Sequence, residues 1–90
     1  MNKRRLILRL FFSMKNVKFN DFVTILTAYG FTLERVEGSH HIYKNPSVSE
    51  QMNVQNKNDE AKPYQIKQFL RLVEKYELRL YDTEENTDDA

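Results

Sequence analysis

The stretch FTLERVEGSHHIYKN, residues 31–45, decides the fold of this chain. It holds two runs rich in aromatic and β-branched residues, FTLERVE and HHIYKN, separated by a Gly-Ser step. Two such runs with a turn residue between them are typical of a β-hairpin. Gly38 supplies the positive φ that a tight turn usually needs, so we expect the turn to be centred on Glu37-Gly38 or on Gly38-Ser39.

The sequence before the hairpin predicts an amphipathic helix over residues 20–29. Its apolar side chains recur at helical spacing and form one stripe: Phe19, Phe22, Val23, Leu26 and Tyr29. Asn20 is expected to cap the start of this helix, and Gly30 to end it in a left-handed conformation.

The sequence after the hairpin predicts a third strand and a closing helix. Asn45-Pro46-Ser47 ends the second strand, because proline cannot donate to a sheet ladder. The chain is expected to turn through PSVSE, residues 46–50, before a short third strand over residues 52–55. A helix is expected from Pro63 to about Tyr76. Its apolar stripe consists of Ile66, Phe69, Leu70 and Val73. A basic stripe on another face consists of Lys67, Arg71 and Lys75.

These elements predict an α+β domain, a three-stranded antiparallel sheet with helices on one face. The chain has 90 residues, which suits one domain; we assign it to residues 1–81, including an extra helix near the N-terminus. The last nine residues carry five acids and no base, and we expect 82–90 to be a disordered tail.

Composition also indicates where the protein acts and what it lacks. There is no cysteine, so no disulfide or thiolate metal site is available, and the cytoplasm is the expected compartment. No apolar run approaches the roughly 20 residues that span a bilayer, so we expect a soluble protein. Neither a metal nor another cofactor is expected, because the signatures of zinc, phosphate-loop and dinucleotide sites are absent.

The only two histidines, His40 and His41, start the second strand of the hairpin. Side chains alternate along a strand, so His40 lies with Ile42 and Lys44 while His41 lies with Tyr43. Burying Ile42 stabilises by roughly 1.5–3 kcal/mol, and Tyr43 can keep its hydroxyl in water, so we expect Ile42 to face the helices. His41 and Tyr43 are then expected on the open face of the sheet. A shifted register reverses the assignment.

The segment FNDFVTILTAYGFTLERVEGSHHIY, residues 19–43, resembles the HicA family of toxins from bacterial toxin–antitoxin pairs. The continuation AKPYQIKQFLRLVEKYEL, residues 61–78, is similar to the closing helix of one subgroup. The resemblance implies a fold similar to the double-stranded RNA-binding domain. It also implies cleavage of messenger RNA when a HicB-type antitoxin is absent. The family's functional histidine ends a Gly-Ser-x-His motif and corresponds to His41.

The resemblance suggests a metal-independent mechanism in which a base removes the proton of a 2′-hydroxyl, which then attacks the adjacent phosphorus. His41 suits the role of base and His40 is a candidate proton donor. The phosphate needs a cation, which Arg35, Lys44 or Lys57 can supply. Further RNA contacts are expected from other polar and basic residues: Ser39, Tyr43, Lys67 and Arg71. For Tyr43 the alternative is a half-buried packing role, and for the two helical cations it is solvation alone.

The chain also departs from the family pattern. Many members carry a proline and a histidine in the third strand, where this chain reads MNVQNKNDEAK. Two alternatives therefore stay open beside the ribonuclease: an RNA-binding module without strong cleavage, and a protein that serves only to bind an antitoxin. The sequence does not determine whether the chain forms homo-oligomers.

Overall fold

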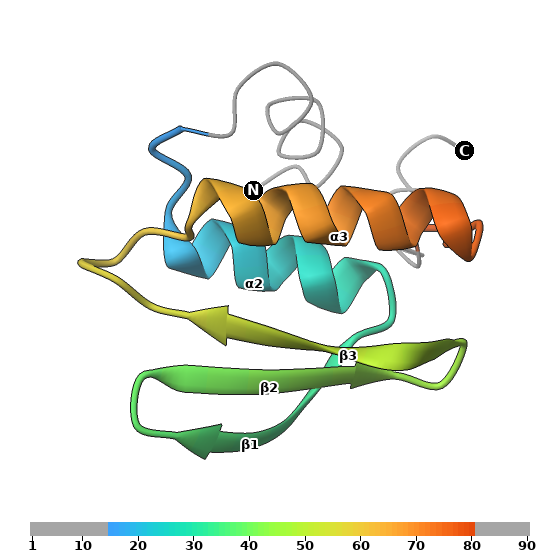
Figure 1. Cartoon of the computed structure of the whole chain (residues 1–90), viewed down its shortest axis with the longest axis horizontal. Helices are drawn as coiled ribbons and strands as arrows, with labels where there is room; N and C mark the ends of the chain where they lie inside the picture. The colour runs from blue at the N-terminus through green and yellow to red at the C-terminus, as the bar shows by residue number, and fades with distance from the viewer. Residues whose placement is uncertain (1–14, 81–90) are drawn as a thin grey trace, which may run out of the picture.

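A computed structural model describes residues 15–80, and it has the expected α+β architecture. The order is α2 (Phe19–Ala28), β1 (Thr32–Glu37), β2 (His40–Asn45), β3 (Val48–Gln55) and α3 (Pro63–Lys75). The three strands form one antiparallel sheet in the order β1-β2-β3. The helices lie side by side, and β1 is the strand farthest from them (Figure 1). The expected N-terminal helix and acidic tail lie outside the described residues.

The hairpin of β1 and β2 turns at Gly38-Ser39, the second of the two positions that the sequence allowed. Glu37 pairs with His40 on either side of the turn, and Gly38 has a φ of +64°. Glycine at the first central position is the signature of a type II′ turn, whose twist matches that of the flanking strands. The two histidines are therefore fixed immediately after a rigid turn.

The third strand is longer than expected, because β3 begins at Val48 and not near Met52. The predicted connection after Pro46 is wrong: the chain turns within residues 46–47 and re-enters the sheet at once. The turn is stabilised by Asn45, which is buried although polar. Its side chain donates to the Tyr29 carbonyl at 2.9 Å and accepts from the Ser47 backbone N–H at 2.8 Å. Both halves of the buried amide are thus satisfied.

The start of α2 also differs from the prediction. Lys18 is the N-cap residue, and no side chain caps the helix. The backbone of Phe19 instead donates to the Asp59 carbonyl at 2.8 Å, so the loop before α3 satisfies a free N–H at the helix start. At the other end, Gly30 has a φ of +93° and Phe31 N–H donates to the Leu26 carbonyl. The predicted glycine stop is confirmed.

The core lies between the helices and the sheet, and Phe69 is at its centre. Its ring meets the rings of Phe22, Tyr29 and Phe31 edge-on, with centroids 5.7, 5.3 and 6.2 Å away. Edge-to-face contacts of this kind add to the gain from burial. The predicted helical stripes are largely buried, and α3 also buries Leu72 and Gln65. Gln65 therefore needs partners inside the fold.

The predicted assignment of the two sheet faces is wrong. Tyr43 is 5% exposed and belongs to the helix-side core, and the ring of His41 contacts that of Phe19 in α2. Ile42 is buried too, but on the opposite face, where it pairs with Asn53.

The third strand explains this orientation. His41 and Tyr43 stand opposite Val54 and Met52, which are fully buried, whereas Ile42 stands opposite a polar residue. Partners directly across an antiparallel pair share a face. The apolar residues of β3 therefore turn the face with His41 and Tyr43 toward the helices.

Candidate functional site

One end of the molecule gathers the β1–β2 turn, the end of β3 and the starts of both helices (Figure 1). Backbone hydrogen bonds join these parts. Asn56 N–H donates to the Ser39 carbonyl at 3.2 Å, and Ala61 N–H donates to the Val17 carbonyl at 2.9 Å. We call this part of the molecule, made of the β1–β2 turn, the end of β3 and the starts of α2 and α3, the histidine end.

His41 lies on the helix side of this end and is partly exposed. Its ring packs against Phe19 with the centroids 4.9 Å apart and the planes tilted by 58°. Nδ1 lies 3.3 Å from the carbonyl oxygen of Ser39. A carbonyl only accepts, so Nδ1 is the donor in this contact, and Nε2 is the ring nitrogen that takes no part in it. Among residues 15–80, nothing hydrogen-bonds to Nε2.

His40 lies on the other face of the sheet and is differently engaged. Its Nδ1 is 3.0 Å from Oδ1 of Asn53, which lies two residues before its cross-strand partner Gln55 on β3. Ser39, in the turn, is exposed and its hydroxyl accepts from Gln55 Nε2 at 3.5 Å. The two histidines are adjacent in sequence, but their side chains project to opposite faces of the sheet.

The loop between β3 and α3 is a tight turn that presents lysines. Lys57 and Glu60 exchange backbone hydrogen bonds of 3.0 and 3.2 Å, and Asn58 and Asp59 between them have φ of 55° and 64°. Two successive positive φ values define a type I′ turn, for which asparagine and aspartate are suited. Asn56 supports the turn by accepting from Asp59 N–H at 2.9 Å.

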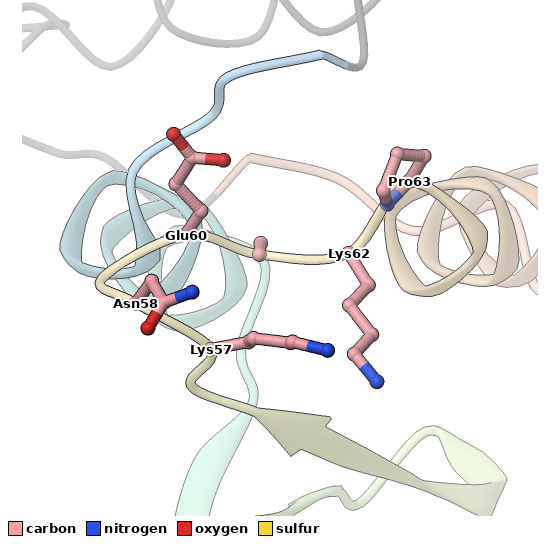
Figure 2. A pocket seen from close by; sticks show the side chains of 6 residues that line it. Lys57, Asn58, Glu60, Lys62 and Pro63 are labelled. Atoms are coloured by element: carbon pink, nitrogen blue, oxygen red, sulfur yellow. The ribbon is translucent and has the colours of Figure 1, made fainter.

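A shallow pocket of about 350 Å³ lies beside this turn and is lined on its basic side by Lys57 and Lys62. Glu60 also lines the pocket. Figure 2 shows the two lysine side chains on the same side of the loop and the Glu60 side chain on the other. Pro63 opens α3 at the edge of the pocket. A second hollow of about 260 Å³ is lined by Lys18, Phe19, Asn20 and Asp59. None of the three lysines forms an ion pair within the described residues.

Two of the expected phosphate-binding cations lie elsewhere. Arg35 stands opposite Ile42, so both share the sheet face away from the helices, and its guanidinium contacts Glu34 and Glu37 at 3.0 and 2.6 Å. Lys44 also contacts Glu34, at 3.2 Å. These cations are therefore neutralised locally and lie on the face opposite His41.

Of the remaining residues expected to contact RNA, Tyr43 is buried, whereas Lys67 and Arg71 are exposed. Tyr43 is enclosed in the core, and burial raises the pKa of its hydroxyl; an enclosed ring has no free face on which a base can stack. Lys67 and Arg71 are exposed on α3 and lie further along this helix than Pro63, which opens it beside the pocket. Of the expected cations, only Lys57 lies with His41.

Three residues of this end were not singled out from the sequence: Lys18, Phe19 as a partner of the imidazole, and Lys62. A signal was present for Lys62, because a residue just before a helix-opening proline is held at the helix N-terminus. Lys18 and Phe19 reach the site only because residues 17–19 pair with residues 59–61. That pairing is set by the tertiary fold.

Within residues 15–80, no three histidine, cysteine, aspartate or glutamate side chains are grouped so that they can hold a metal ion. In the same part of the chain, no helix has the length and apolar character needed to span a bilayer.

This combination defines a class: a small α+β domain with a histidine at the start of the strand that follows a hairpin turn, and with lysines at the same end. A family model described as "HicA toxin of bacterial toxin-antitoxin" matches residues 19–74, more than half of the chain. The protein belongs to the HicA toxin family, and so to the toxins of bacterial toxin–antitoxin pairs. Searches of curated proteins and of solved structures gave no match.

Proposed function

We propose that the protein is a metal-independent endoribonuclease that cleaves messenger RNA in the cytoplasm, with His41 as the general base. The proposal rests on the hydrogen bonding of the two ring nitrogens of His41. Nδ1 is turned to the Ser39 carbonyl, and Nε2 has no partner among the described residues. Histidine exchanges protons near neutral pH, and a fixed tautomer presents its lone pair in one direction.

The step requires only groups that RNA and the protein supply. His41 Nε2 takes the proton of a ribose 2′-hydroxyl, and the oxygen attacks the adjacent phosphorus. The bond to the 5′-oxygen breaks, and that oxygen takes a proton from water. The products are a 2′,3′-cyclic phosphate and a 5′-hydroxyl end. Lys57 and Lys62 would neutralise the phosphate backbone beside the site, because both line a pocket at the same end of the molecule.

Family membership supports an antitoxin as protein partner, and we propose that this antitoxin is of the HicB type. An antitoxin that covers the histidine end would exclude RNA without any change in the toxin fold. Catalysis, RNA binding and antitoxin binding should separate by substitution: the imidazole serves catalysis, the lysines serve RNA binding, and a protein interface should tolerate loss of either.

The test is the chemistry of the cut. Purified protein is incubated with a labelled single-stranded RNA in EDTA, and with the same strand carrying 2′-deoxyribose at the cleaved position. We expect cleavage of the RNA to cyclic-phosphate ends and none of the substituted strand. Cleavage of both strands, or loss of activity in EDTA, would contradict the mechanism. If neither strand is cut but Lys57→Gln and Lys62→Gln weaken RNA binding, the protein is a binding module.

A further inference from the structure

The outer edge of β1 is open, and its side chains are all exposed. Every residue of Thr32–Glu37 is solvent-accessible, including Leu33 at 48% and Val36 at 51%. Within residues 15–80, β1 pairs only with β2, and no backbone hydrogen bond from β1 reaches any other segment. An open strand edge is a template on which another strand can add.

The backbone groups available on this edge follow from the turn. Glu37 and His40 close a two-residue hairpin, so their N–H and C=O groups point at each other. Because bonded and non-bonded pairs alternate along an antiparallel ladder, the N–H and C=O of Val36 point outward. The same alternation directs Asn53 and Gln55 outward from β3, and both are indeed bonded to the side chain of Gln65.

We propose that this edge pairs with the same edge of a second copy of the chain, around a two-fold axis at Val36. In this register Val36 faces Val36 of the other copy, and their outward groups satisfy each other. Arg35 then stands opposite Glu37 of the other copy, and Glu37 opposite its Arg35. Arg35 and Glu37 share the face away from the helices in each copy, so the charges meet directly.

The side chains of β1 are free to make this contact, and the length of the strand limits its area. Arg35 and Glu37 already pair within one strand, and their side chains are 47% and 63% exposed. The guanidinium has further donors for a second carboxylate. The bulge between Leu33 and Arg35 breaks the ladder beyond this short segment. Six residues span roughly 20 Å, so the contact is smaller than a stable interface of about 1,200–2,000 Å². The dimer should be weak and concentration-dependent.

The other edge of the sheet makes the assembly stop at two copies. Gln65 occupies two of the outward groups of β3, the Asn53 carbonyl and the Gln55 N–H, so β3 offers no free ladder at residues 53–55. A self-complementary edge with a capped opposite edge closes as a dimer and does not extend into a fibre. The His41 side chains of the two copies would then lie on one face of a six-stranded sheet, about 15 Å apart across three strand spacings. This assembly does not depend on whether the protein cleaves RNA.

The test is sedimentation of the full chain from micromolar to millimolar concentration. The parent should change from monomer to dimer within this range. Arg35→Glu and Glu37→Arg each place like charges opposite one another, and each should weaken the dimer at least tenfold. The double variant Arg35→Glu/Glu37→Arg keeps the charges complementary and should restore it. Tyr64→Lys, at another exposed apolar side chain, should leave it unchanged.

Two results would overturn the proposal. One is a dimer that both single charge variants leave intact. The other is a parent that stays monomeric throughout. If the binding of this monomer to a co-purified antitoxin is lost in Val36→Lys but kept in Tyr64→Lys, the edge serves that partner instead. Circular dichroism of each variant establishes that the comparison is made between folded proteins.

Discussion

The two edge strands of the same sheet have opposite surroundings. β3 is covered by helices on one face, and buried Gln65 caps its outer edge at residues 53–55: it donates to the Asn53 carbonyl at 2.9 Å and accepts from Gln55 N–H at 3.3 Å. β1 has none of this cover among the described residues. One edge is therefore held against the helices and keeps the fold and the end with His41 in place. The other remains available for a contact.

The largest expected effect tests the packed side. Phe69→Ala removes the ring at the centre of the aromatic core and should lower the free energy of unfolding by about 3–5 kcal/mol, because a cavity is left behind. Leu33→Ala on β1 is the matched control and should change it by less than about 0.5 kcal/mol, because its side chain is already half exposed. Urea denaturation measures both; similar losses would mean that β1 is not the uncovered strand described.

The next effect tests the cap on β3. Gln65→Leu leaves the Asn53 carbonyl and the Gln55 N–H without their side-chain partner, which should cost about 1–3 kcal/mol of unfolding free energy. Gln68→Leu, on the same helix, makes the same chemical change at a position with no such contact and should have little effect. Equal stability of the two variants would show that the amide does not cap the edge.

The smallest effect tests the far end of β3. Glu50 accepts hydrogen bonds from Lys75 and from the Tyr76 hydroxyl at 2.9 and 3.0 Å, and these bonds lower its pKa below the ordinary value of 4.5. Because the folded-state pKa is lowered, the stabilisation is complete above the unfolded-state pKa. It is lost as pH falls through the folded-state pKa.

Thermal melts across acidic pH compare the parent with Glu50→Gln. As pH falls below about 4.5, the melting temperature of the parent should decrease more than that of the variant. The difference should be small, because both side chains are exposed. Glu74→Gln is the control and should follow the parent. Parallel curves for the parent and Glu50→Gln would show that the hydrogen bonds of Glu50 to Lys75 and Tyr76 do not stabilise this end of β3.

Much of the fold could be predicted from local patterns. The hairpin, the glycine stop at Gly30 and the proline start at Pro63 depend on backbone conformations that few residues adopt, so sequence alone locates them. The length of β3 could not be predicted, because Pro46 was expected to lead into a longer turn. The buried amide of Asn45 closes that turn within two residues through contacts that arise only in the folded chain.

The sequence predicted which histidine belongs to the candidate site, but not the face of the sheet on which it lies. The Gly-Ser-His-His motif indicated His41, but its face depended on which residues of β3 lie opposite it. Comparing Ile42 with Tyr43 inside one strand gave the wrong face, since Met52 and Val54 across the sheet decide it. Lys18 and Lys62 join the site only through pairing of residues 17–19 with residues 59–61, a contact far apart in sequence.

The central claim is that His41, and not its neighbour, carries the chemistry. The most direct measurement is the rate of RNA cleavage in EDTA by the parent, His41→Ala and His40→Ala, compared at equal melting temperature. We expect a loss of at least a hundredfold for His41→Ala, within the range typical of a general base, and near-parental activity for His40→Ala. Equal activity of His41→Ala and the parent would contradict it, and so would loss of activity only in His40→Ala.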